Sequence, residues 1–177
     1  QYGMGLRDLL PTYFRNDEID IEDVRRLPVV MERIESEKSI GLLFAMIDKY
    51  YPNDLETRIE ALRSLNALQR DFSGLRIPPS LIYREIAREI KIYRLTLGSL
   101  NCQRQLTENC AGDLLEGRNG LISILKQRHH NNTDRLFRLL GMRYGATNII
   151  PTFRGIQSKE HSHRVSALEF LDNLLDN

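Results

Sequence analysis

The sequence has few of the features that identify secreted proteins, membrane spans or disulfide-bonded domains. No run of apolar residues approaches the roughly 18 that a membrane-spanning helix needs, and we expect no signal peptide. The two cysteines, Cys102 and Cys110, lie eight residues apart in one expected helical region. Because side-chain neighbours on a helix are three or four residues apart, we expect no disulfide between them and therefore a reducing compartment. The first residue, Gln1, indicates a segment of a longer protein.

The sequence also lacks the motifs that accompany common enzyme chemistry. It contains no G-x-G-x-x-G, P-loop, G-x-S-x-G or H-E-x-x-H pattern. The four histidines occur as His129–His130 and as His161 with His163, and neither pair indicates a metal site. The net formal charge of +1 gives no global field that would attract nucleic acid. We therefore predict a protein that is not an enzyme and has no cofactor, no metal and no nucleic-acid partner.

Helical spacing of apolar residues runs through most of the chain, whereas alternating strand patterns are almost missing. The sequence therefore predicts an all-α fold. We expect that Pro28 kinks the first clear helix or delays its start, that Ser39 caps the next helix, and that a boundary falls over 72–79. The expected helices cover 24–34, 40–47, 55–68, 82–100 with an irregular continuation to 112, 121–130, 133–144, 148–157 and 161–175.

Two of these helices are expected to be separated by a break. Leu121, Ile124 and Leu125 mark a helix that should end near Asn131–Asn132, because two consecutive asparagines are poor helix formers. Thr133 is then the expected N-cap of the following helix, which Gly145 should stop.

An internal repeat indicates how the helices are arranged. Shifting the chain by 106 residues aligns Thr57–Leu62 with His163–Leu168 without a gap, and the aligned pairs continue upstream and downstream. These further pairs are Leu65 with Leu171, Leu68 with Leu174, Leu43 with Ile149, Ile47 with Phe153 and Tyr50 with Ile156. A small alanine lets paired helices approach, leucines fill the layer between them, and an arginine near the helix start stays at the polar turn. A weaker copy begins at Val24–Arg25.

This R-[IV]-x-A-L-x-x-L pattern resembles HEAT repeats, which are about 40 residues long. A single helix pair cannot bury both of its faces, so such pairs stack. We expect antiparallel helix pairs stacked as a short, irregular α-solenoid. The expected organisation is one domain over 1–177, with repeat character in 1–75 and 113–177 and a long connecting helix in 76–112.

The last forty residues carry a more specific resemblance. The segments Arg135–Gly141, Phe153–Ile156 and Ala167–Leu175 are similar to the HEAT-repeat region of large bacterial membrane proteins that begin with an ATP/ADP translocase-like transporter. Some members of that family also carry a cyclic-nucleotide-binding domain. The resemblance implies a location on the cytoplasmic side of a membrane protein and a role in interaction or regulation. It implies no transport or nucleotide site in this chain, because that chemistry would lie in spanning helices.

Five charged residues lie in the otherwise apolar helices of this region: Arg135, Arg138, Arg154, Glu169 and Asp172. They could form a polar groove that receives a partner or a neighbouring domain. We favour the alternative that arginines and carboxylates of adjacent helices pair and fix the packing register. The specific expectation is that Arg154 pairs with Glu169 or Asp172.

A basic face is expected on the central helix, where the chain is locally positive: residues 76–112 carry a net charge of +3. It consists of Arg84, Arg88, Lys91 and Arg94. A basic amphipathic helix can contact acidic lipid headgroups or nucleic acid. The alternative that we favour is a solvated face, because Glu85 and Glu89 interleave with the cations and should form weak local pairs.

We expect a non-catalytic helical domain that docks a protein partner or an adjacent domain of its parent membrane protein. Two alternatives remain open: a free-standing cytosolic scaffold with the same fold, and an enzyme of the HEAT-like lyase kind. An enzyme would require an enclosed cleft with convergent polar groups, whereas a shallow concave face would favour docking.

Overall fold

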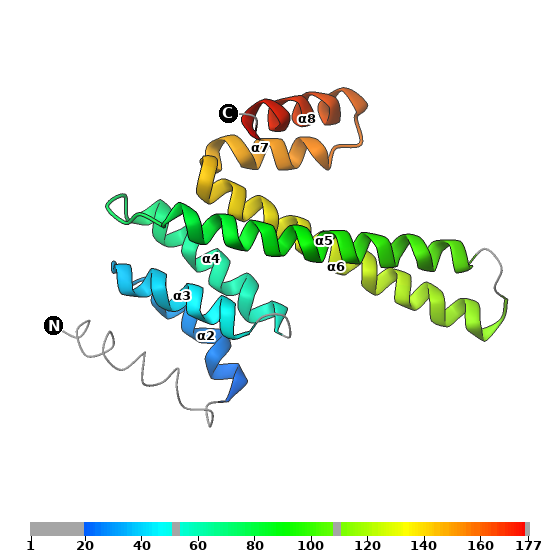
Figure 1. The fold of residues 1–177 in the computed structure, drawn as a ribbon, viewed down its shortest axis with the longest axis horizontal. Helices are drawn as coiled ribbons and strands as arrows, with labels where there is room; N and C mark the ends of the chain where they lie inside the picture. Colours follow the sequence, from blue (N-terminus) through cyan, green and yellow to red (C-terminus); the bar gives the residue numbers. More distant parts are fainter. Residues whose placement is uncertain (1–19, 51–53, 108–110, 176–177) are drawn as a thin grey trace. The chain divides into compact units, whose positions relative to one another are not determined.

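The computed structural model describes residues 20–50, 54–107 and 111–175 (Figure 1). These residues form helices and no strand, so the predicted all-α class is confirmed. The chain divides into two compact units, 1–81 and 82–177, and the division lies just beyond the predicted boundary at 72–79. The single domain over 1–177 stays a prediction. None of the helices within the described residues is long and apolar enough to cross a membrane.

Unit 1 contains three mutually packed helices, α2 (Ile21–Met31), α3 (Glu37–Lys49) and α4 (Leu55–Asp71). Each begins at a side chain that accepts a backbone hydrogen bond: Asp20, Ser36 and Asp54 respectively. The apolar faces meet in one core, which contains Val24, Met31, Leu43, Phe44, Ile47, Ala61, Leu62, Leu65 and Leu68.

Two sequence predictions for unit 1 can be compared with the helix starts. Of the two alternatives given for Pro28, the late start is wrong, because Asp20 caps the helix and α2 continues through Pro28 to Met31; a kink at Pro28 stays a prediction. Ser39 is not the cap of α3. Its hydroxyl donates instead to the carbonyl of Ile34 at 3.1 Å, and Ser36 accepts from the Lys38 amide at the helix start.

Unit 2 contains α6 (Asp113–Tyr144), α7 (Ala146–Ile156), α8 (His161–Leu175) and all but the first turn of α5 (Pro79–Thr107). Contacts of α5 with α6 join Tyr83 to Arg143, Tyr93 to His129 and Gln103 to Arg118. Residues early in one helix thus meet residues late in the other, and the two form an antiparallel hairpin (Figure 1).

The predicted break near Asn131–Asn132 is wrong, because α6 is continuous through it. Asn132 is fully buried and donates to the backbone carbonyl of Glu89 on α5 at 3.2 Å. Thr133 is no N-cap: its hydroxyl donates to the carbonyl of His129 one turn earlier, at 2.9 Å. Packing against α5 therefore outweighs the low helix propensity of two asparagines. The predicted stop at Gly145 is confirmed, with a positive φ of 93°.

The predicted repeat falls on two helix hairpins, α3–α4 and α7–α8, each packed within its own unit. The aligned alanines, Ala61 and Ala167, are both buried. The aligned arginines differ. Arg164 lies at the α7–α8 turn as predicted and donates to the carbonyls of Ser158 and Lys159 at 2.9 and 2.8 Å, but Arg58 is fully buried rather than at a polar turn.

Candidate functional site

Arg135, one of the predicted polar residues, lies inside the α5–α6 hairpin. Its side chain is fully buried, and Nε donates to Oε2 of the equally buried Glu89 at 3.0 Å. The same carboxylate accepts from the amide of Asn132. A buried carboxylate needs such partners, since an unpaired charge in the interior is strongly unfavourable. Arg135 thus pairs with a carboxylate of an adjacent helix, as predicted, with Glu89 as a partner that the sequence did not indicate; its role in fixing the packing register stays a prediction.

The other four predicted polar residues do not form a cluster with Arg135. Arg138 pairs within α6, Nε to Asp134 Oδ2 at 2.7 Å, and both side chains are about one-third exposed. Arg154, Glu169 and Asp172 are exposed, and no ion pair joins them in the described residues. The predicted pairing of Arg154 is therefore wrong, because α7 and α8 meet through their apolar faces and leave these charges outside.

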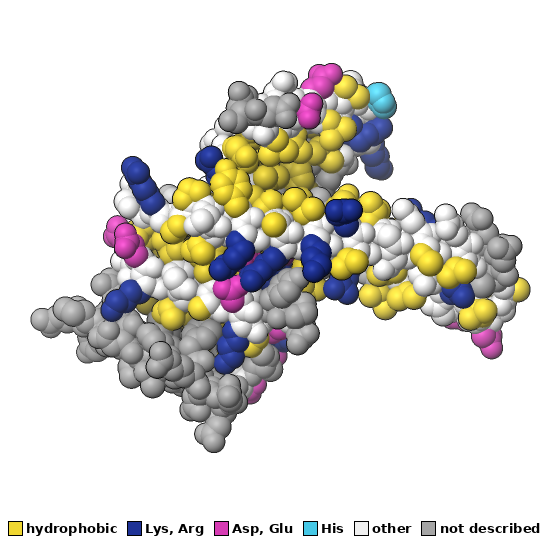
Figure 2. Space-filling model, in the orientation of Figure 1, with side chains coloured by type: hydrophobic (Ala, Val, Ile, Leu, Met, Phe, Trp, Pro, Cys, Tyr) yellow, Lys and Arg dark blue, Asp and Glu magenta, His cyan; other side chains and the backbone are white. Residues whose placement is uncertain are grey.

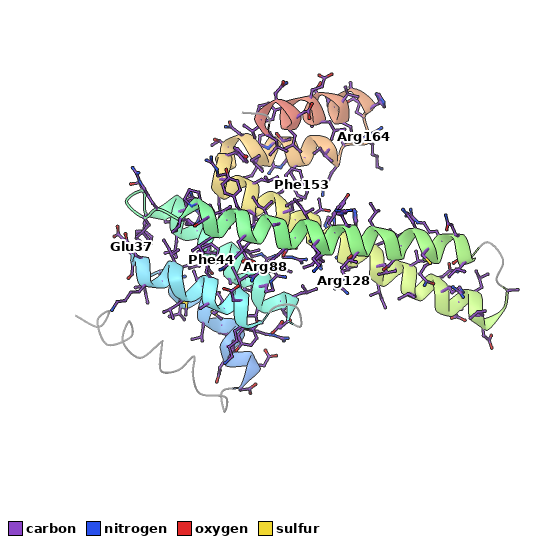
Figure 3. The ribbon with its side chains drawn as sticks, in the orientation of Figure 1. Glu37, Phe44, Arg88, Arg128, Phe153 and Arg164 are labelled. Carbon is purple, nitrogen blue, oxygen red and sulfur yellow. The ribbon has the colours of Figure 1, made fainter. Side chains whose placement is uncertain are left out.

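The predicted basic face is present on α5. Arg84, Lys91 and Arg94 are exposed, while Arg88 is half-buried. Arg84 and Arg88 both donate to Oε1 of buried Glu85, at 3.1 and 2.8 Å. The predicted local pairing is thus confirmed for Glu85, whereas Glu89 bonds to α6. Figure 3 shows Arg88 and Arg128 on the same side of the hairpin.

The sequence did not predict an open groove between α7 and α8. It has a volume of about 430 Å³ and a mostly apolar lining. Its walls contain Pro151 and Gly155 of α7 and Ala167 and Phe170 of α8, with polar atoms at its edge from residues such as Asn148 and His163. Figure 2 shows hydrophobic side chains gathered over these helices. Because it is shallow and open, the groove suits a docked side chain or helix better than an enclosed substrate.

Gly155 determines how closely the two walls of the groove approach. A Cβ built on Gly155 would lie 2.7 Å from the Cβ of Ala167 and 3.3 Å from the carbonyl oxygen of His163. Only glycine fits here without a shift of the helices. Phe153 of α7, labelled in Figure 3, meets Phe137 of α6 with ring centroids 4.7 Å apart. Those rings belong to a core that also contains Leu140 and Ile149.

A second polar cluster lies in unit 1, at the start of α4. Asp54 Oδ1 accepts from the amides of Glu56 and Thr57, and Oδ2 accepts from the Thr57 hydroxyl at 2.7 Å. Nε of Arg25, on α2, lies 3.5 Å from Oδ2 of Asp54. Partial burial alone would raise the pKa of Asp54, but the bonds from Thr57 and the charge of Arg25 outweigh it, so that the pKa lies below the ordinary value of 3.8. The cluster joins α2 to the start of α4.

No group of three or more histidine, cysteine or acidic side chains is placed to hold a metal ion within the described part of the chain. The absence of a metal, of a cofactor and of catalysis stays a prediction. Comparison of the chain with protein-family models, with curated proteins and with solved structures found no match.

Proposed function

We propose that this chain is a non-catalytic helical interaction domain, built from HEAT-like helix pairs, that docks a protein partner or a neighbouring domain in the α7–α8 groove. The observation that carries the proposal is the groove itself, an open apolar surface with Phe170 on its wall, 42% exposed. A large aromatic side chain exposed beside an apolar groove is typical of a contact surface.

The groove favours one kind of occupant. It runs between two helices, and its walls include Gly155 and Ala167, which have almost no side chain. A partner helix can therefore insert an apolar side chain at this point, as amphipathic helices do in other grooves. In a HEAT-like array, the next helix pair would stack on the same kind of face.

The parent protein proposed for this domain is a bacterial membrane protein with an ATP/ADP translocase-like transporter, with the domain on its cytoplasmic side. Support comes from the sequence resemblance over Arg135–Gly141, Phe153–Ile156 and Ala167–Leu175. The occupant of the groove would then be another segment of the parent or a protein bound to it.

Site-specific photocrosslinking tests the docking site. A photoreactive residue at Ser166, which lines the groove, should crosslink in cells to one defined partner segment. The matched control is the same residue at Asp172, which is exposed on α8 but does not line the groove. Equal crosslinking from both positions, or none from Ser166, would contradict docking in the groove.

A further inference from the structure

The distal part of the α5–α6 hairpin leaves one side with large apolar residues exposed. On α6 these are Leu114, Leu121 and Ile124, with exposed fractions of 60%, 41% and 66%. On α5 they are Leu95 and Leu106, at 64% and 44%. Two helices alone cannot cover such residues, because each already uses its inner face to contact the other. Exposed groups at this density mark a contact surface.

The exposed residues follow a regular spacing on both helices. On α6, Leu114, Gly117, Leu121 and Ile124 are separated by three, four and three residues, which is the spacing of a coiled-coil seam. On α5, four exposed residues spaced by four, three and four positions form a corresponding line along that helix. We call these eight residues the outer seam: Leu95, Ser99, Cys102, Leu106, Leu114, Gly117, Leu121 and Ile124.

The two halves of the outer seam lie on the same side of the hairpin. At about 100° per residue, the α5 line is displaced by about 110° from the buried residues that face α6, such as Thr96 and Leu100. The α6 line is displaced by about 100° from its own facing residues, such as Ile122, in the same rotational sense. In two antiparallel helices, equal angular displacements in the same rotational sense direct both lines of residues toward the same side of the hairpin.

Within the part of the chain that the structure describes, no contact requires glycine at position 117. A Cβ built there would meet no atom within 4 Å, and the same holds for Gly98 and Gly120 nearby. Glycine inside an exposed helix costs about 1 kcal/mol relative to alanine. Of these three glycines, Gly117 belongs to the outer seam, and a second helix packed closely over the seam would use the space that its missing side chain leaves.

The outer seam is complementary to itself under a two-fold rotation. The contacts Tyr93–His129 and Gln103–Arg118 place Leu100 of α5 level with Leu121 of α6. A two-fold axis that crosses both helices of the hairpin at this level places Leu95 opposite Leu106 of a second copy. It also places Ser99 opposite Cys102 of that copy. The same axis places Ile124 of one copy over the space at Gly117 of the other. The residues of α5 and the residues of α6 therefore match under one axis, each independently of the other. A dimer with such an axis is isologous, so every contact occurs twice.

The charges of the hairpin favour this antiparallel arrangement. The segments 91–95 and 124–128, which flank one end of the seam, carry four cations and no acid: Lys91, Arg94, Lys126 and Arg128. The segments 103–107 and 113–118 at the other end have zero net charge and include the exposed carboxylates of Asp113 and Glu116. A parallel dimer would bring the four cations of one copy against the same four cations of the other copy, and these would repel. The antiparallel dimer places them beside the carboxylates of the second copy instead.

We propose that the outer seam pairs with the outer seam of a second copy of this chain, so that two α5–α6 hairpins form an antiparallel four-helix bundle. This dimerisation surface is separate from the α7–α8 groove and does not depend on the proposed docking function.

Sedimentation of the full chain tests the pairing. As concentration rises from about 1 to 200 μM, a range in which modest interfaces assemble, the mass should increase from 20.6 kDa toward 41.2 kDa, twice the chain mass. The double variant Leu121→Glu/Ile124→Glu should stay monomeric. The control Val165→Glu/Leu168→Glu, which changes exposed apolar residues of α8 outside the groove lining, should dimerise like the original chain. Circular dichroism checks that every variant is folded.

Two further variants test the register. Gly117→Gln raises helix propensity but fills the space for Ile124, so it should abolish dimerisation while helicity is kept. In a Cys110→Ser background, Ser99→Cys should give a disulfide-linked dimer through Cys102 under mild oxidation. Ser123→Cys, exposed on another side of α6, should not. A chain that stays at 20.6 kDa, a dimer unaffected by Leu121→Glu/Ile124→Glu, or binding to anionic vesicles without dimerisation would each overturn the proposal.

Discussion

The contact between Gly155 and Ala167 gives the sharpest test of how α7 packs on α8. The substitution Gly155→Ala would place a methyl group 2.7 Å from the Ala167 Cβ, far inside the ordinary contact distance between two carbons. The Ala167 Cβ is attached directly to the backbone and cannot rotate away. The helices must therefore separate, which loosens the apolar layer between them.

The size of the effect follows from two opposing contributions. Forcing one extra carbon into a tight helix contact costs about 1–3 kcal/mol. Replacing a helical glycine with alanine contributes up to about 1 kcal/mol in the stabilising direction. We expect a net loss of about 1 to 2 kcal/mol for Gly155→Ala, since the overlap involves two fixed groups, the Cβ of Ala167 and the carbonyl of His163.

Urea unfolding followed by circular dichroism measures this difference. The matched control is Gly41→Ala in α3, where a new Cβ meets no atom within 4 Å, and it should stabilise its unit by up to about 1 kcal/mol. The double variant Gly155→Ala/Ala167→Gly exchanges the two side chains and should recover part of the loss. If Gly155→Ala were as stabilising as Gly41→Ala, the close packing of α7 on α8 would be wrong.

Three further predictions concern buried and capping groups. Ala167→Asp should destabilise unit 2 by several kcal/mol, because it buries an unpaired charge; an unchanged melting curve would contradict the predicted helix pairing. Arg135→Ala should cost about 3–5 kcal/mol by leaving the buried Glu89 carboxylate without the positive charge of Arg135, whereas the joint change Arg135→Met/Glu89→Leu should cost much less in the same urea assay; equal losses would refute the ion pair. The pKa of Asp54 is lowered in the folded chain, so its carboxylate stabilises the fold above its ordinary pKa of 3.8 and that contribution is lost as pH falls through the folded value. The variant Asp54→Asn keeps a capping oxygen but cannot ionise, so its stability should fall less steeply below about pH 4 when unfolding is measured as a function of pH. An unchanged pH dependence below about pH 4 would exclude this role for Asp54.

Periodicity predicted most of the helices because it reports directly which face is buried. The spacing of Leu43 with Ile47 and of Leu62 with Leu65 places apolar groups on one stripe, and these residues are the core of unit 1. Helix α8 begins and ends at the predicted residues, and Gly145 stops α6 through its positive φ. These features depend on local sequence alone.

The error at Asn131–Asn132 occurs where a distant residue decides the local structure. Asn132 lies within a helix because its side chain bonds to Glu89, 43 residues earlier, and local propensity contains no information about that contact. Arg135 is buried for the same reason. The groove between α7 and α8 depends on how closely two helices approach, which Gly155 and Ala167 set together. The only local signal was the position of Gly155, twelve residues before the repeat alanine Ala167. That spacing indicates a close contact only once α7 and α8 are known to form a hairpin.

The most direct test of the proposed function is the size and location of the native protein in cells. An antibody against this domain, applied to fractionated cells of the source organism, should detect a membrane-associated band several times larger than 20.6 kDa. That result would agree with an interaction domain joined to a transporter. A single soluble band near 20.6 kDa would contradict the membrane-protein context and favour a free-standing helical scaffold.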